Sequence, residues 1–107
     1  MANLINWINE MADGEEIEAI VFGEKDFASF AEDYTPHPLL NKVISFEEAE
    51  PILDYEFNDG YHTTGCHPIT AWTKSWVIFI STYDSSTSPC RLPRNPTDFE
   101  PYMPGGG

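Results

Sequence analysis

Two histidines and two cysteines come nearest to a reactive site in this chain. His62, Cys66 and His67 lie within six residues of one another, and Cys90 follows after a predicted hairpin. Imidazole and thiolate are ligands that Zn²⁺ prefers, but the spacing matches none of the paired zinc signatures. We expect ordinary loop histidines and free thiols, with a metal site on these four residues and a Cys66 to Cys90 disulfide as open alternatives.

Nucleophilic catalysis by Cys66 would need a base beside its thiol. His67 is adjacent in the sequence, but neighbouring side chains of an extended chain point apart. The sequence contains no Gly-rich phosphate loop, no nucleophile elbow and no paired-histidine helix. We therefore expect no enzyme, no catalytic residue and no cofactor.

The acidic residues are concentrated in the first part of the chain. Fifteen of the eighteen lie at or before Asp59, and the first 59 residues carry the whole net charge of −13. With only five Lys and Arg residues, direct binding to nucleic acid or to an anionic membrane is not expected. This field favours a protein partner with a basic surface, although solubility alone would explain it too. The candidate binding acids are Glu47, Glu48, Glu50, Asp54, Glu56 and Asp59.

Two tryptophans and one arginine complete the candidate binding residues. Trp72 and Trp76 would anchor an interface if they were exposed on one face, and otherwise belong to the packing of a sheet. Arg94 lies between Pro93 and Pro96 in a rigid bend. It either closes a corner by pairing with a carboxylate of the acidic half or belongs to a binding corner.

The region from 54 to 96 predicts antiparallel strands. The run 76–83 is rich in β-branched and aromatic residues, with shorter strand patterns at 68–73 and 87–92 on either side. Lys74 and Ser75 form a short hairpin turn. Alternation places Trp76 with Ile78 and Ile80 on one face and Val77 with Phe79 and Ser81 on the other. Because both faces are apolar at the start of the run, we expect a central strand covered on both sides.

The N-terminal part predicts one helix and one strand. Asn3 is a suitable N-cap for a helix with an apolar stripe, which ends at Asp13 and Gly14. The run 17–22 reads as a strand stopped by Gly23, with the acids before it as a solvated approach. The segment 25–33 is ambiguous between a helical turn and a packed loop. The helical stripe consists of Leu4, Ile5, Trp7, Ile8 and Met11.

The middle of the chain predicts a second, shorter helix. Ser45 and Glu48 stand in capping-box register after a brief strand at 43–44. Pro51 is expected to interrupt or end the helix early, which leaves one or two turns, with resumption through Leu53 as an alternative. The run 55–57 is expected to begin the sheet, followed by a tight left-handed turn at 58–60.

These patterns together predict an α+β fold. We expect a small, mostly antiparallel sheet of four to six strands with one or two short helices, the first near the N-terminus. Residues 1–98 form one domain, and 99–107 form an extended tail rich in proline and glycine. No apolar stretch is long enough to span a membrane, and the N-terminus is not typical of a secretory signal. A cytoplasmic location follows as an expectation, and the oligomeric state stays open.

Eight short blocks of the chain carry a resemblance when they are taken together. The blocks are residues 15–24, 55–57, 59–61, 71–73, 77–79, 83–84, 93–96 and 103–106. In combination they resemble a family of small proteins widespread in bacteriophages of actinobacteria. The chain departs from the family pattern at His62 and Ser85, where glycines are expected. The resemblance implies a phage protein located in the host cytoplasm, and it assigns no enzymatic activity and no catalytic residue.

The functional hypothesis that follows is a non-enzymatic protein-binding module. Given the phage origin that the resemblance implies, the partner is a host or phage protein with a basic surface, such as a host defence or nucleic-acid-handling protein that the module inhibits. A minor virion or assembly component is an alternative of a different class. A small metal-dependent enzyme using the histidines and cysteines is a third.

Overall fold

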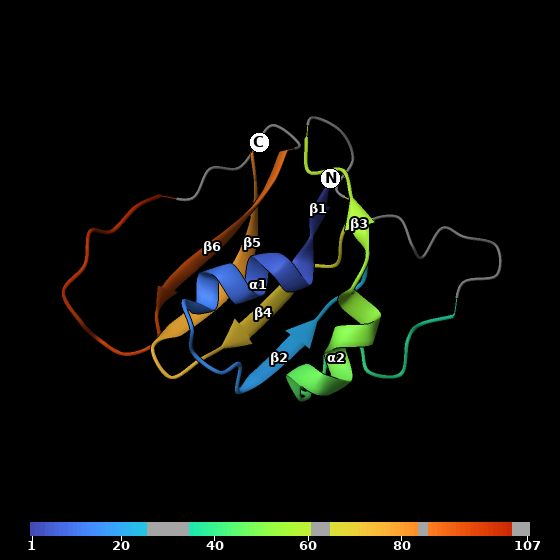
Figure 1. The fold of residues 1–107 in the computed structure, drawn as a ribbon, viewed down its shortest axis with the longest axis horizontal. Helices are drawn as coiled ribbons and strands as arrows, with labels where there is room; N and C mark the ends of the chain where they lie inside the picture. The colour runs from blue at the N-terminus through green and yellow to red at the C-terminus, as the bar shows by residue number, and fades with distance from the viewer. Residues whose placement is uncertain (26–34, 61–64, 84–85, 104–107) are drawn as a thin grey trace.

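A computed structural model of the chain describes residues 1–25, 35–60, 65–83 and 86–103 (Figure 1). It has two helices, the first near the N-terminus, and two antiparallel sheets, so the predicted α+β class is confirmed. The helices are α1 (Leu4–Ala12) and α2 (Phe46–Leu53). The four-stranded sheet has the order β2 (Ala19–Phe22), β4 (Ile69–Trp72), β5 (Trp76–Tyr83), β6 (Ser86–Pro93), and the two-stranded sheet pairs β1 (Ala2–Asn3) with β3 (Glu56–Phe57).

Strand β5 lies inside the main sheet, as its sequence predicts. It pairs with β4 across the hairpin at 73–75 and with β6 along its whole length. Ile78 is fully buried, and Trp76 and Ile80 pack against the same core, which confirms the predicted alternation of faces. A run of β-branched and aromatic residues suits such a strand because its side chains pack against neighbours on both sides.

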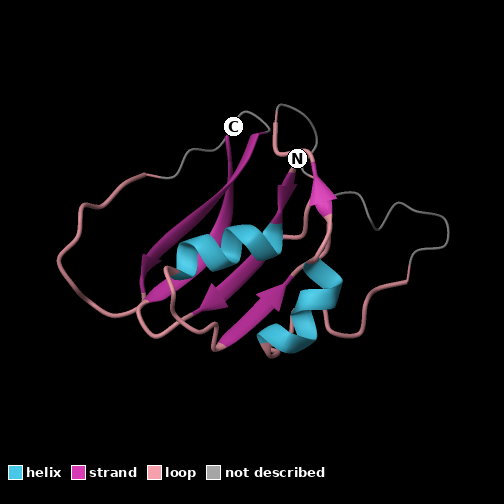
Figure 2. Ribbon diagram, viewed as in Figure 1, coloured by secondary structure: helices cyan, strands magenta, loops and turns pink. Residues whose placement is uncertain are grey.

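The expectation that both faces of β5 are covered by earlier segments is wrong. Buried residues of both helices join Ile78 in one core, so α1 and α2 lie over the same face (Figure 2). On the other face, Val77 and Phe79 are only partly buried. Val77 stands directly opposite Trp72 on β4, and such large cross-strand neighbours shield each other.

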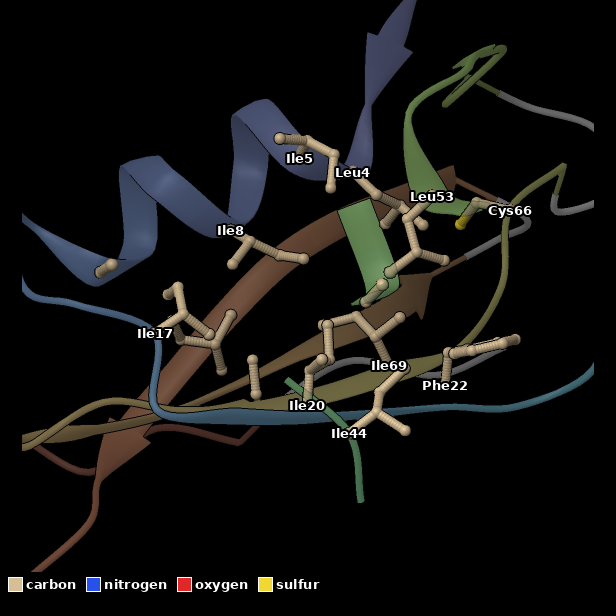
Figure 3. Packing of buried hydrophobic residues seen from close by; sticks show 14 of the residues in the cluster. Leu4, Ile5, Ile8, Ile17, Ile20, Phe22, Ile44, Leu53, Cys66 and Ile69 are labelled. Carbon is tan, nitrogen blue, oxygen red and sulfur yellow. The ribbon is translucent and has the colours of Figure 1, made fainter. Parts of the chain in front are cut away.

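Helix α1 follows the local signals of its sequence. The Asn3 side chain accepts hydrogen bonds from the backbone N–H groups of Ile5 and Asn6, which satisfies two free donors at the helix start. Asp13 and Gly14 end the helix in the left-handed region, with φ of 52° and 85°. The apolar stripe points at the sheet, and Ile8 lies over the core in Figure 3.

Helix α2 has the predicted capping box but runs through its proline. Ser45 Oγ accepts the Glu48 N–H at 3.1 Å, while Glu48 Oε1 accepts the Ser45 N–H at 3.2 Å. Pro51 lies inside the helix, so the expected break at Pro51 is wrong, but the expected short length is confirmed, because the helix has eight residues and ends at Leu53. A proline near the end of a short helix removes a single backbone hydrogen bond, and burial of Ala49 and Leu53 holds the helix in place on either side of Pro51.

Two further expectations for the middle of the chain are wrong. Glu56 and Phe57 pair with the N-terminal strand β1 and do not join the main sheet. The Asn3 side chain adds to this pairing by donating to Asp54 Oδ1 at 2.9 Å. The bend at 58–60 needs no left-handed residue, because the Asn58 side chain accepts the Gly60 N–H at 2.9 Å. Most of the ambiguous segment 25–33 lies outside the described residues.

The outer edge of β6 is closed to strand pairing by two prolines. Arg94 N–H donates inward to Ser75 O and Thr87 N–H donates outward to Asp59 O, so the backbone groups of Pro89 and Pro93 face outward by alternation. Proline has no N–H to offer a further strand. If copies of the chain associate, we therefore do not expect edge-to-edge pairing at β6.

Glu15 holds the turn between β4 and β5. Its carboxylate accepts hydrogen bonds from Thr73 Oγ1 at 2.6 Å, from Ser75 Oγ at 2.6 Å and from the Ser75 N–H at 3.0 Å. The hydrogen bonds from Ser75 and then Thr73 lower the pKa of Glu15 below its ordinary value of 4.5.

Replacement of Glu15 by glutamine is therefore expected to lower the melting temperature at neutral pH. Because the folded-state pKa is depressed, the stabilisation is fully present above pH 4.5 and is lost as pH falls through the folded-state value. Thermal unfolding of the native protein and of Glu15→Gln is measured between pH 7 and pH 3. The difference between their melting temperatures should disappear at low pH. A gap that is constant over the whole range would show that ionisation of Glu15 contributes nothing.

Candidate functional site

An acidic hollow lies between the approach to β2 and the first turn of α2. It is a groove of about 350 Å³. Ile17 and Phe46 are its apolar residues, and four carboxylates surround them. The complete lining is Glu16, Ile17, Glu18, Ser45, Phe46, Glu47 and Glu50.

Backbone pairing between distant segments builds the groove. Ile20 and Ile44 exchange two hydrogen bonds, with N to O distances of 3.0 and 2.9 Å, and this bridge brings the start of α2 beside β2. Ile17 and Ala49 are buried, which fixes the two walls against the core. Residues three apart on a helix share a face, so Glu47 and Glu50 project from α2 together.

The groove keeps most of its negative charge unneutralised. Glu18 pairs with Arg94, and this is the one ion pair in the part of the chain that the structure describes. Glu16, Glu47 and Glu50 are exposed. Glu47 lies in the first turn of α2, where the helix dipole favours a carboxylate. Acidic groups around an apolar floor fit the ammonium or guanidinium head and the aliphatic stem of lysine or arginine.

Of the six acids predicted to bind, the groove contains Glu47 and Glu50. Glu48 is engaged in the capping box, and Asp54 accepts a hydrogen bond from Asn3. Glu56 belongs to β3 and the Asp59 carbonyl to the bend beside β6, so neither lines the groove.

The other two acids of the groove, Glu16 and Glu18, are not among the predicted binding residues. The sequence pattern places Glu16 in a solvated approach to a strand and Glu18 within the predicted strand 17–22 itself. One available signal was Ile17, an apolar residue between two acids that becomes buried when the strand is formed.

The three remaining candidates do not form one surface. Trp72 and Trp76 lie on opposite faces of the sheet, since Trp72 pairs with Val77 whereas Trp76 packs against the core. Arg91 stacks on Trp76 with its Cζ 3.9 Å from the ring centroid. Arg94 pairs with Glu18 and donates to Thr73 O at 2.8 Å. Arg94 thus makes the pairing with a carboxylate of the acidic half that the corner-closing alternative requires.

The thiols and imidazoles are not assembled into one centre. Cys66 belongs to the core, whereas Cys90 lies across from Phe79 on the opposite face of the sheet, with its Sγ 3.1 Å from Ser81 Oγ. No disulfide joins Cys66 to Cys90. His62 lies outside the described residues. In the portions that are described, no three His, Cys, Asp or Glu side chains are arranged to hold a metal ion.

The two thiols are expected to react at very different rates. Cys66 is 1% exposed, whereas Cys90 is partly accessible. A thiol reagent such as dithionitrobenzoate should label Cys90 first, with Cys66 slower by roughly two orders of magnitude because a local opening of about 3 kcal/mol must precede its reaction. Absorbance kinetics on Cys90→Ser should lack the fast phase. Equal rates in the native protein would contradict the burial of Cys66.

Comparison with known proteins adds no assignment. The chain matches no family model, no curated protein and no solved structure. Of the helices within the described ranges, none has the length and apolar character needed to cross a membrane. The acidic groove is therefore the candidate site on its geometry and charge.

Proposed function

We propose that the protein is a non-enzymatic binding module that docks a basic surface of another protein through the acidic groove. The observation that supports this proposal is the convergence of Glu16, Glu47 and Glu50 around Ile17 and Phe46. These carboxylates come from segments about thirty residues apart, and they have no cationic partner within the described chain. A basic partner would supply the missing charge and cover the apolar floor.

The partner class follows from charge and from the resemblance to phage proteins. A net charge of −13 repels nucleic acid and steers the protein toward positively charged surfaces at long range. Proteins that handle nucleic acid carry such surfaces. We therefore assign the module to the host cytoplasm during infection, where it inhibits a host defence or nucleic-acid-handling protein by occupying its basic groove.

The test is affinity capture from host extract with a groove variant and a matched control. The groove variant carries Glu16→Gln, Glu47→Gln and Glu50→Gln. The control removes the same charge at other exposed positions through Glu10→Gln, Glu56→Gln and Glu100→Gln. Each lost rim charge is worth about 0.2–1 kcal/mol, so the groove variant should bind the captured partner about ten-fold more weakly.

The salt dependence of capture distinguishes binding through the groove from binding through the rest of the charged surface. Capture by the native protein should fall as ionic strength rises, because exposed charges are screened over about 10 Å at 0.1 M salt. The groove variant should lose most of this salt dependence, while the control keeps it. Equal loss in both variants would show that overall charge, not the groove, attracts the partner. If the partner is still captured at high salt, the contact is made by apolar residues outside the groove.

A further inference from the structure

A second cluster of titratable side chains lies beyond the end of β2, outside the acidic groove. Phe22 is fully buried, and two imidazole rings pack edge-on against its ring. The centroid of His37 lies 5.7 Å from that of Phe22, and the centroid of His67 lies 5.4 Å from it. Phe22 therefore brings together two histidines that are thirty residues apart in the sequence.

A lysine joins the two histidines through Tyr55. The Tyr55 ring lies 5.6 Å from the His67 ring, and Lys25 Nζ lies 4.2 Å from the centroid of Tyr55. The segments that carry Lys25 and His67 are held together at Gly23, whose N–H donates a hydrogen bond to Pro68 O. Glycine permits this close approach, because a Cβ at position 23 would lie 3.0 Å from Pro68 Cγ. The cluster holds three of the eight Lys, Arg and His residues of a strongly acidic chain.

Hydrogen bonds fix the tautomers of both imidazoles. His37 Nδ1 accepts the Leu39 N–H at 3.1 Å. The Tyr55 hydroxyl oxygen accepts the backbone N–H of His67 at 2.9 Å, and it lies 2.7 Å from His67 Nδ1. We assign the hydroxyl proton to the bond with Nδ1, because the described residues offer this hydroxyl no other acceptor. A neutral imidazole that accepts at Nδ1 carries its proton on Nε2. Both rings therefore present an N–H donor at Nε2.

These donors have no acceptor within the described residues. The hydrogen bonds of His37 and His67 all use Nδ1 or backbone atoms, which leaves Nε2 of each ring unbonded. Lys25 contributes a full positive charge and three further N–H donors. Three groups from three segments thus offer N–H donors that no oxygen among the described residues accepts.

Burial and two neighbouring cationic groups act on the protonation of His67. Burial, the charge of Lys25 and then that of His37 lower the pKa of His67 to about 4. Burial also raises the pKa of Tyr55 to about 12, so the hydroxyl keeps the proton that it donates to Nδ1. A bound anion would oppose the effect of Lys25 and His37.

We propose that Lys25, His37 and His67 bind a phosphate-type oxyanion. A phosphoryl group offers three terminal oxygens to the three donor groups, and its double negative charge gains more from the lysine than a single carboxylate does. This proposal does not depend on the acidic groove. The groove lies at the start of α2 and Tyr55 follows its end, so a helix about 12 Å long separates the two sites.

The first experiment measures affinity by NMR of the imidazole resonances. Inorganic phosphate is added at pH 7 and constant ionic strength, with chloride as the balancing anion. The His37 and His67 signals should shift together along one saturable curve. Lys25→Gln and His37→Gln should each weaken binding about ten-fold, whereas Lys42→Gln, which removes the other lysine of the N-terminal half from an exposed position, should leave it within two-fold.

The second experiment measures the protonation of His67 directly. Sulfate is the probe because it stays doubly charged throughout the acid titration. Saturation with sulfate should raise the apparent pKa of His67 from about 4 by at least one unit, which corresponds to about ten-fold tighter binding to the imidazolium form. Tyr55→Phe keeps the ring contacts but removes the hydroxyl that donates to His67 Nδ1. The His67 ring is then no longer restricted to one tautomer, which should change the ¹⁵N chemical shift of Nδ1.

Two results would overturn the proposal. One is a His67 pKa that is the same in sulfate and in chloride. The other is an equal loss of phosphate affinity in Lys25→Gln and Lys42→Gln, which would show that the anion is attracted by nonspecific positive charge. Circular dichroism of each variant separates lost binding from lost folding. None of these measurements involves the groove acids, so failure here leaves the docking function standing.

Discussion

Replacement of Phe22 by alanine is expected to remove about 3–5 kcal/mol from the free energy of unfolding. The side chain is fully buried at the end of β2, and its ring supports both His37 and His67. A domain of this size has a total stability of roughly 5–15 kcal/mol, so the variant should be near the limit of folding. Urea unfolding followed by tryptophan fluorescence gives the change in midpoint.

Phe99 provides the matched control for this prediction. It is the same residue type, but it is 49% exposed in the segment that follows the sheet. Phe99→Ala should cost less than about 1 kcal/mol, because little apolar surface returns to water. If the two variants were equally destabilised, the division between the domain at 1–98 and the tail at 99–107 would be wrong, since Phe99 would belong to the core.

The local features of the fold could be predicted from the sequence because each depends on a few neighbouring residues. The Asn3 cap, the end of α1 at Asp13 and Gly14, and the Ser45 to Glu48 capping box all act within four residues. The alternation of faces along β5 is equally local, because successive strand side chains point to opposite sides.

The pairing of distant segments could not be predicted in this way. Two residues of β3 carry no signal that distinguishes the main sheet from β1, which lies more than fifty residues earlier. What selects β1 is the packing of Phe57 against Trp7, with ring centroids 5.2 Å apart, together with the hydrogen bond between Asn3 and Asp54. Such contacts exist only after the chain is folded.

The candidate sites depend on the same long-range contacts. The groove acids meet through the pairing of Ile20 with Ile44, and the anion cluster meets through the ring of Phe22. From the sequence, His67 is expected to be an ordinary loop histidine, with metal ligation and a role as base for Cys66 as the alternatives considered. Its actual neighbours, Lys25 and His37, come from segments that gave no strand or helix pattern. The composition predicts that the surface is acidic, but it does not predict where the few basic side chains cluster.

Replacement of Ile8 by alanine is the second substitution with a large expected effect, about 2–5 kcal/mol of lost stability. Ile8 is fully buried where α1 crosses the main sheet, so its removal opens a cavity between the two layers (Figure 3). Alanine is a better helix former than isoleucine, which offsets only a few tenths of a kcal/mol. The loss should therefore come from packing between α1 and the sheet, not from the helix itself.

The next residue on the same helix separates these two contributions. Asn9 is exposed, and Asn9→Ala should raise stability by about 0.5 kcal/mol because alanine favours the helix. The two alanine variants one position apart are thus expected to change the urea midpoint in opposite directions. If both substitutions were neutral, α1 would not be docked on the sheet. If both were destabilising to the same extent, the Asn9 side chain would make a contact that its exposure does not indicate. Opposite signs would confirm that the apolar stripe of α1, and not its helical propensity, ties the N-terminus to the strands that carry both candidate sites.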